Sequence, residues 1–418
     1  MPSVSARVQD KLATSTNPTG AMDRYQRITQ ANQVFTPGYP VNQKDLFAGR
    51  MEQLQRVLDT LHAPGRHPVI FGQRGVGKTS LANILSQVLK ELLTVKVSCD
   101  GGDTFATIWN RILHTASVTF KQHALGFSAE DSNRTVTLGD ALGHDPTSTK
   151  PAEMADLLRR VNQPTVIILD EFDKITDQST KAAFADLIKI LSDTAPLVTV
   201  ILVGVAENIH ELVGEHASIE RNLVHVELPL MSDNEIETIF TIGLTKLGNT
   251  WDAAIPTQVS RLSGGFPHYA HLLGLASAKA TANDDALELT MVRFDAACNV
   301  ALQDAIEKYR DAFARATATT QKSRYPLLLA ACGYAQTDSR GVFRATDVTD
   351  AFNNVFGESL TVQAVVPALG EFLQSHRAAV LKAEMVRGRQ CYRFRDPMMR
   401  PFCRLKAREY MALPRQSQ

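Results

Sequence analysis

The sequence predicts an α/β fold with a parallel sheet as its core, followed by a helical domain and a small C-terminal domain. Three observations predict it. Short apolar runs that suit buried strands alternate with stretches of helical periodicity up to about residue 230. From residue 232 the apolar residues recur mainly at helical spacing. Near the C-terminus, two short alternating runs flank a tight turn.

The first half of the chain supplies the elements of the core, expected at residues 45–231. Residues 1–44 are polar and are expected to form an arm that becomes ordered near Val34 and Phe35. The expected elements of the core are a helix at 46–61, a strand at 68–71, a glycine-rich turn at 72–79, a helix at 80–93, a strand at 94–98, a helix at 105–116, a loop-rich insertion at 127–149, a helix at 152–161, a strand at 165–169, a helix at 180–191, and strands at 197–205 and 224–228.

The second half predicts two further domains, at residues 232–315 and 316–418. The helical domain begins at a capping box, in which Ser232 is followed three residues later by Glu235. The last domain is expected to contain helices at 325–334, 345–356 and 361–376, and then strands at 380–386 and 390–394. Three helices followed by a hairpin indicate a winged helix.

Composition narrows the class of protein. The 418 residues correspond to roughly two to three domains of about 150 residues each. Hydrophobic residues make up 44% and charged residues 21%, which excludes wholesale disorder. There is no secretion signal and no apolar run of about 18 residues, so we expect a cytoplasmic protein without a membrane partner. The five scattered cysteines predict reduced thiols and no zinc framework.

A glycine-rich motif carries the clearest chemical signal. The segment Gly72-Gln-Arg-Gly-Val-Gly-Lys-Thr79 matches G-x-x-x-x-G-K-[ST] and lies between a predicted strand and a predicted helix. The glycines let backbone N–H groups wrap phosphates, and the helix N-terminus adds positive potential. The motif predicts ATP or ADP as ligand and Mg²⁺ as cofactor. The predicted nucleotide-binding residues of this segment, together with the residue after it, are Gly72, Arg74, Gly75, Val76, Gly77, Lys78, Thr79 and Ser80.

An acidic strand end is the predicted partner of this loop. Leu169-Asp-Glu-Phe-Asp173 follows an apolar run, and a carboxylate at the end of a buried strand is costly unless it meets a cation. Thr79 and Asp170 are therefore the predicted Mg²⁺ ligands. Lys78 is expected to reach the β- and γ-phosphates, and Glu171 is expected to orient or deprotonate the attacking water.

These motifs, together with Leu46-Phe-Ala-Gly-Arg-Met-Glu52 and Gly264-Gly-Phe-Pro267, occur in an order that resembles AAA+-related P-loop ATPases. The resemblance covers about residues 34–300 and is to the branch of origin-recognition-type initiators and STAND-type ATPases. It implies a P-loop NTPase core, a helical lid and a C-terminal winged helix. It also implies an ATP-hydrolysing, nucleotide-gated switch in a homo-oligomer or larger assembly, such as a bacterial defence or mobile-element system.

The resemblance assigns further roles within the core. Val34, Phe35, Phe47 and Arg50 correspond to the adenine-side edge of the site, and the alternative for Phe47 is a core residue. Asn208 corresponds to the sensor-1 residue, with Glu207 as a competing register.

Two more implied roles lie later in the chain. Arg221 corresponds to an arginine finger that acts across a subunit interface; the alternative is a surface ion pair with Glu220 or Glu215. Pro267 corresponds to the proline that meets adenine in STAND-type members. His268 stands where AAA+ members usually carry a sensor-2 arginine, and it is alternatively a solvated or core histidine.

Charge is distributed unevenly along the chain. Lys plus Arg and Asp plus Glu both total 44, so the net charge is zero. Residues 377–418 nevertheless carry 11 basic and three acidic residues, a net charge of +8. This tail suits DNA phosphates or the acidic body of the protein, and a solvated surface is the alternative. The residues proposed to contact nucleic acid are Arg387, Arg389, Arg393 and Arg395.

Overall fold

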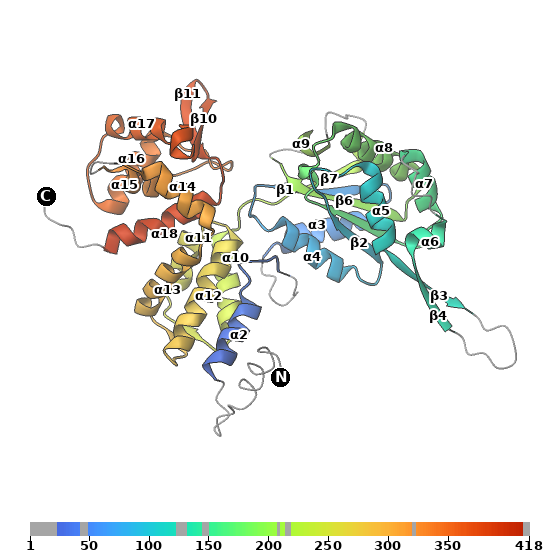
Figure 1. The fold of residues 1–418 in the computed structure, drawn as a ribbon, viewed down its shortest axis with the longest axis horizontal. Coiled ribbons are helices and arrows are strands. Elements are labelled where there is room, and N and C mark those ends of the chain that lie inside the picture. The colour runs from blue at the N-terminus through green and yellow to red at the C-terminus, as the bar shows by residue number, and fades with distance from the viewer. Residues whose placement is uncertain are drawn as a thin grey trace, which may run out of the picture. The chain divides into compact units, whose positions relative to one another are not determined.

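The computed structural model describes residues 23–41, 49–122, 132–143, 150–206, 210–213, 219–319 and 323–412. The chain divides into two compact units (Figure 1). The sheet unit spans residues 40–230, and the helical unit combines the chain before residue 40 with the chain from residue 231 onward. In the described residues, no helix is both long enough and apolar enough to span a membrane.

The core of the sheet unit is a five-stranded parallel sheet, which confirms the predicted α/β class. Its strands have the order β2-β5-β6-β1-β7, and every neighbouring pair is parallel. The strands are β1 (His67–Gly72), β2 (Leu93–Ser98), β5 (Thr165–Asp170), β6 (Val198–Val205) and β7 (Leu223–Glu227). Because all five run in one direction, their carboxyl ends meet at one edge, where ligands of open α/β sheets bind.

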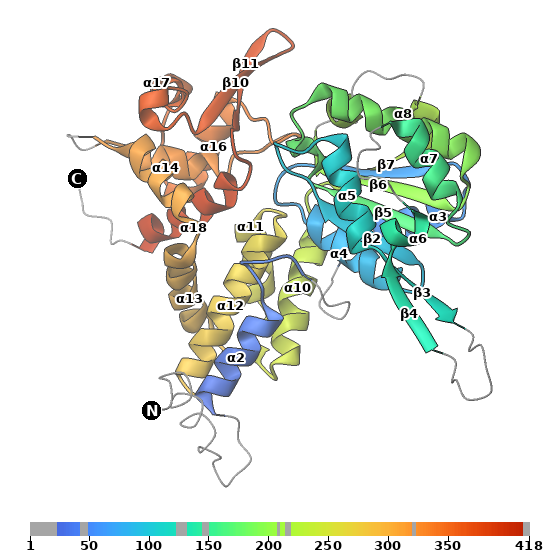
Figure 2. The same ribbon diagram turned by 45° about the vertical axis from the view of Figure 1, so that its right-hand side comes forward.

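Helices cover both faces of this sheet (Figure 2). Helices α3 (Met51–Leu61) and α4 (Lys78–Val88) cover one face, and α5 (Phe105–Thr115), α7 (Pro151–Arg159) and α8 (Gln178–Thr194) cover the other. Successive strand residues point to opposite faces. The strands β1, β5 and β6 therefore contribute to both apolar layers and read as continuous apolar runs, which made them predictable. Strand β2 contributes Val95 and Val97 to only one layer, and its alternating sequence predicted it.

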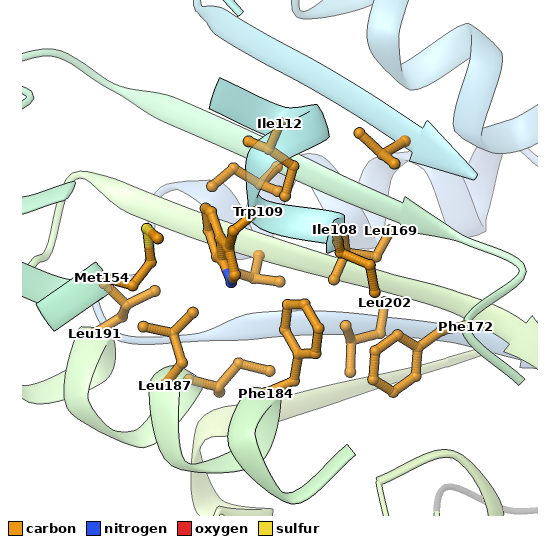
Figure 3. Packing of buried hydrophobic residues seen from close by; sticks show 14 of the residues in the cluster. Ile108, Trp109, Ile112, Met154, Leu169, Phe172, Phe184, Leu187, Leu191 and Leu202 are labelled. Carbon is orange, nitrogen blue, oxygen red and sulfur yellow. The ribbon is translucent and has the colours of Figure 1, made fainter. Parts of the chain in front are cut away.

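The layer under α5 and α8 is built around aromatic side chains (Figure 3). The rings of Trp109 and Phe184 stack with centroids 6.2 Å apart, and Phe172 meets Phe184 edge-on at 5.5 Å. Leu169 and Leu202 of the sheet pack into the same cluster. Phe172 follows Glu171 directly, so this packing holds the turn that carries Glu171.

The prediction of a loop-rich insertion at 127–149 was wrong for its described part. A hairpin of β3 (Ser117–Gln122) and β4 (Ser132–Thr137) extends from the sheet unit and leads into α6 (Leu138–Leu142) (Figures 1 and 2). The strands pair in antiparallel register, with Val118 opposite Val136. The pattern of β-branched residues is the strand signal that the polar composition concealed. Residues 123–131 and 144–149 lie outside the described part.

Other differences in the sheet unit are at the ends of elements. Helix α4 ends at Val88 and not at residue 93, and strand β2 begins at Leu93, which pairs with Thr165. Short helices α9 (His210–Val213), η2 (Phe172–Lys174) and η3 (Glu220–Asn222) lie between the expected elements. The described part of the expected helix at 46–61 begins at Met51.

The helical unit begins as the capping box predicted. Ser232 Oγ accepts a hydrogen bond from Glu235 N at 3.3 Å, and the Glu235 carboxylate accepts one from Ser232 N at 2.8 Å. The helices that follow are α10 (Asp233–Lys246), α11 (Ile255–Ser263), α12 (Pro267–Asn283), α13 (Met291–Asp304) and α14 (Glu307–Thr317). Two short strands not expected from the sequence, β8 (Thr250–Trp251) and β9 (Glu288–Leu289), pair in parallel.

The chain before residue 40 is packed on this helical unit. Helix α2 (Arg24–Val34) lies beside α12 in both ribbon views (Figures 1 and 2). Phe35, which is 1% exposed, follows it and meets Gly243 of α10 and Gly274 of α12. A Cβ on either glycine would lie 2.3 Å from the Phe35 ring, so the two glycines form the seat for this side chain. The Phe35 ring is buried in the helical unit and is not exposed to a ligand, contrary to the adenine-side role implied by resemblance.

The last part of the chain has the expected order of elements. It contains α15 (Tyr325–Cys332), α16 (Ala345–Phe356), α17 (Val362–Glu371), the short helix η4 (Ser375–Arg377), β10 (Leu381–Val386) and β11 (Arg389–Phe394). The helix α18 (Met399–Ala412) follows and was not expected. Pro401 concealed it, although proline is tolerated in the first turn of a helix.

Candidate functional site

The predicted phosphate loop lies at the carboxyl end of β1. The strand ends at Gly72, and α4 begins at Lys78 with Gly77 as its N-cap. Gly75 and Gly77 have φ values of 86° and 98°, in the left-handed region that favours glycine. A Cβ on Gly72 would lie 2.4 Å from the backbone oxygen of Leu228. The loop therefore leads into the N-terminus of α4, where backbone N–H groups without helical partners can bind phosphate.

The Lys78 side chain turns back into this loop. Its Nζ donates hydrogen bonds to Gly72 O at 2.9 Å and Gln73 O at 2.8 Å. Burial lowers the pKa of Lys78 to about 8, and the negative charges of Asp173 and Asp170 oppose this shift. At neutral pH, Lys78 is thus an ammonium held inside the loop, where it can neutralise phosphate charge.

The structure brings the two predicted Mg²⁺ ligands together from distant parts of the sequence. Asp170 is the last residue of β5 and is 1% exposed. Its Oδ1 lies 3.4 Å from Thr79 Oγ1 and accepts a hydrogen bond from Glu171 N at 3.0 Å. A carboxylate and a hydroxyl are the hard oxygen donors that Mg²⁺ prefers, so the residues fit the metal that the motif implies.

Lys96 is a member of this site that sequence reasoning missed. It lies on β2, next to β5, and its Nζ is 2.9 Å from Asp170 Oδ2, an ion pair without hydrogen-bond geometry. Lys96 Nζ also donates to Asn83 Oδ1 at 2.6 Å. The available signal was a lysine between Val95 and Val97 on a strand beside the acidic strand end.

Glu171, the predicted base, lies at the turn after β5. It has a left-handed φ of 58°, and its carboxylate pairs with Lys174 Nζ at 2.7 Å. The Glu171 side chain is 42% exposed, so this pair is open to solvent and readily exchanged. Asp173 has a different role, because its Oδ1 accepts a hydrogen bond from Val205 N at 2.7 Å. Asp173 thus ties the acidic turn to the end of β6.

Arg50 and Ser80 support the phosphate loop from outside. The Arg50 guanidinium is buried and donates to Pro229 O and, at 3.4 Å, to Val76 O. Ser80 Oγ accepts a hydrogen bond from Val41 N at 3.3 Å. These contacts make Arg50 a positioning residue of the loop. Val76 has a fully buried side chain, while Arg74 is exposed on the loop.

Arg221 lies at the opposite edge of the sheet. It precedes β7, whose first residue, Leu223, pairs with His67 at the start of β1. A strand of six residues spans roughly 20 Å, so Arg221 is about that far from the phosphate loop of its own chain. Its side chain is exposed, and Glu215, one of its two alternative ion-pair partners, lies outside the described residues. Arg221 therefore cannot complete the nucleotide site of its own chain.

Four predicted site residues remain, and the described part of the structure contains two of them, Pro267 and His268. Asn208, its alternative Glu207, and Phe47 lie outside the described residues. Pro267 and His268 open α12 of the helical unit. There, His268 Nδ1 is 2.9 Å from Pro37 O and donates to it, and burial lowers the pKa of His268. This contact holds the chain before residue 40 to the helical unit, and the nucleotide-binding roles of Pro267 and His268 stay predictions.

The predicted nucleic-acid residues fall into two groups. Arg387 and Arg389 are exposed at the turn of the β10–β11 hairpin. Arg393 is instead paired with Glu384 across the hairpin, and Arg395 Nε donates to Leu381 O at 3.3 Å.

Most of the basic tail is engaged within the helical unit. Arg400, for example, donates to Ala335 O at 2.8 Å and to Thr337 Oγ1 at 3.0 Å, and burial lowers its pKa to about 9. The tail cations with partners inside the unit are Arg377, Arg393, Arg395, Arg400, Arg404, Lys406 and Arg408. Most of the cations behind the charge of +8 therefore hold contacts within the helical unit.

Comparison with known proteins supports the assignment of the core. The sequence model described as the AAA ATPase domain matches residues 46–201. No curated protein matches the chain. Similar solved structures include the Orc1 protein of Aeropyrum pernix in complex with DNA, at 14% identity and a TM-score of 0.44, covering 93% of this chain and 96% of that one.

Two further similar structures are from other archaea. Cdc6p from Pyrobaculum aerophilum has 14% identity and a TM-score of 0.46, covering 90% of this chain and 98% of that one. A Walker-type ATPase of Pyrococcus abyssi has 15% identity and a TM-score of 0.48, covering 89% of this chain and 99% of that one. The domain match includes the phosphate loop, Asp170 and Glu171, and it confirms that this chain resembles AAA+ P-loop ATPases through its core.

Proposed function

We propose that the protein is a Mg²⁺-dependent ATPase whose hydrolysis of ATP resets a conformational switch. The observation that carries the proposal is the meeting of Lys78, Thr79 and Asp170 at the carboxyl edge of the sheet. A buried cation, a hydroxyl and a buried carboxylate gather there beside a helix N-terminus. These groups can bind the phosphates of a nucleoside triphosphate and its metal ion.

Each residue has a distinct task in this proposal. The backbone N–H groups of the loop and Lys78 hold the phosphates, whose oxygens offer charge-assisted hydrogen bonds in place of the loop carbonyls that Lys78 now contacts. Thr79 and Asp170 would hold Mg²⁺, which neutralises phosphate charge when bound. Glu171 orients and deprotonates the attacking water once it is released from Lys174.

The test separates nucleotide binding from hydrolysis. We expect Glu171→Gln to lower ATP turnover by about 100-fold or more, because an amide cannot accept the proton of the water. ATP affinity should stay within about threefold of wild type, because the phosphate-binding residues are unchanged. Turnover is measured by phosphate release and affinity by titration with a fluorescent ATP analogue. The matched control is Glu91→Gln, at an exposed glutamate outside the site. Equal turnover in wild type and Glu171→Gln would refute the role of Glu171.

A homo-oligomer is part of the proposal because of the position of Arg221. This exposed arginine is at the edge of the sheet away from its own phosphate loop. A guanidinium at such a position can neutralise transition-state charge only in the site of a neighbouring subunit. We infer that ATP brings copies of the chain, or the chain and a partner protein, into an assembly. A role of that assembly in a bacterial defence or mobile-element system follows only from the sequence resemblance.

DNA binding by the hairpin is a second candidate function, and the exposure of Arg387 and Arg389 favours it. We expect the double variant Arg387→Ala/Arg389→Ala to bind duplex DNA more weakly than wild type. The slope of log affinity against log salt should fall by about two, because each lost phosphate contact releases one counterion fewer. The control is Arg310→Ala/Arg315→Ala, which removes the same charge from exposed positions on α14. Equal loss of affinity in both double variants would exclude a specific role for the hairpin.

A further inference from the structure

Lys96 is held in place beside the predicted metal ligand from two directions. Its ammonium lies 2.9 Å from Asp170 Oδ2 and donates a hydrogen bond to Asn83 Oδ1 at 2.6 Å. Asn83 belongs to α4, the helix that begins with Lys78 and Thr79. The lysine therefore reaches from the neighbouring strand into the space between the acidic strand end and the helix of the phosphate loop.

The two oxygens of Asp170 have different surroundings. Oδ1 accepts from Glu171 N and lies near Thr79 Oγ1, at 3.0 Å and 3.4 Å. Oδ2 faces Lys96 and accepts no hydrogen bond from the residues that the structure describes. The side chain of Asp170 is 2% exposed and that of Lys96 is 20% exposed. A buried carboxylate without a counter-ion is costly, so Lys96 supplies the charge that Asp170 needs when no metal is bound.

We propose that Lys96 is a resident counter-ion of Asp170 that competes with Mg²⁺ and so sets the Mg²⁺ concentration at which the site is filled. The inference rests on the proposed function, because it takes Asp170 as a metal ligand. A metal at Asp170 and the ammonium of Lys96 are like charges beside one carboxylate, and their repulsion is strong where water is largely excluded. Lys96 thus weakens Mg²⁺ binding and stabilises the metal-free protein. Because Lys96 acts on the metal through Asp170 and does not bind it, Lys96 is a positioning residue.

The experiment titrates Mg²⁺ against the full chain with saturating ADP and follows the thermal unfolding midpoint, so that no turnover is needed. We expect Lys96→Met to reach half of its Mg²⁺-dependent shift at a Mg²⁺ concentration at least about tenfold below wild type. Lys96→Arg, which keeps the charge, should stay near wild type. Lys90→Met, at an exposed lysine of the same unit, is the matched control and should equal wild type. An unchanged or higher Mg²⁺ requirement in Lys96→Met overturns the inference.

A second measurement tests the inference even if the Lys96→Met variant is too unstable for the Mg²⁺ titration. Without metal or nucleotide, Lys96→Met should unfold at a lower temperature than wild type. Adding Asp170→Asn should restore part of the loss, because it removes the uncompensated buried charge. No recovery in the double variant would also overturn the inference. If Mg²⁺ never shifts the wild-type midpoint, the proposed metal site itself fails. If wild type responds and Lys96→Met needs the same Mg²⁺, only the role of Lys96 fails.

Discussion

Lys78→Ala is expected to weaken ATP and ADP binding by about 100-fold or more, equivalent to roughly 2.7 kcal/mol. The wild-type ammonium is buried inside the phosphate loop, where a cation from solution cannot take its place. Alanine is a good helix former at the start of α4, so the fold should survive the change. The measurement is the dissociation constant of a fluorescent nucleotide in the presence of Mg²⁺.

The pH dependence of wild type checks the same residue. Burial lowers the pKa of Lys78 to about 8, so the ammonium loses its proton as pH rises through that value. Nucleotide affinity should therefore fall above about pH 8 in wild type and be flat over this range in Lys78→Ala. Lys90→Ala, at an exposed lysine, is the control and should retain both the affinity and its pH dependence. A folded Lys78→Ala variant with wild-type affinity would contradict the site.

Phe35→Ala is expected to lower the free energy of unfolding of the helical unit by about 3–5 kcal/mol. The ring is seated against Gly243 and Gly274 and meets His271 edge-on, with centroids 6.1 Å apart. Glycine has no side chain that could rearrange to fill the cavity left by the ring, so the loss should be near the upper end of the range. Burial lowers the pKa of His271 to about 4, and its neutral ring accepts a hydrogen bond from Thr36 N at 3.2 Å.

The change in the free energy of unfolding is measured by chemical denaturation followed by far-ultraviolet circular dichroism. The matched control is Tyr25→Ala, which removes an aromatic ring from α2 that is 66% exposed and should cost less than about 0.5 kcal/mol. Proteolysis should also cut before residue 40 faster in Phe35→Ala than in Tyr25→Ala. Equal stabilities of the two variants would show that Phe35 does not anchor this segment.

The parts of the fold that sequence predicted are those with a local physical signal. The strands at 165–169 and 197–205 are buried on both faces and therefore read as apolar runs. The capping box at Ser232 is defined by residues three apart. The hairpin at 117–137 and the helix α18 were missed, because a polar composition and Pro401 masked their periodicity.

The sequence by itself determined the parallel sheet, the phosphate loop and the acidic residues expected to serve it. Spacing of glycines along a short turn and the alternation of strand and helix are enough for this, because both are properties of neighbouring residues.

Only the tertiary structure decided which partner each charged or apolar side chain meets and where Arg221 lies. It paired Lys96 with Asp170, seated Phe35 on two distant glycines, engaged most of the basic tail internally, and placed Arg221 at the far edge of the sheet. Most of these depend on contacts between residues far apart in the chain, as between Lys96 and Asp170. Charge and apolar character can be read from the sequence, but the partner that satisfies them is chosen by packing.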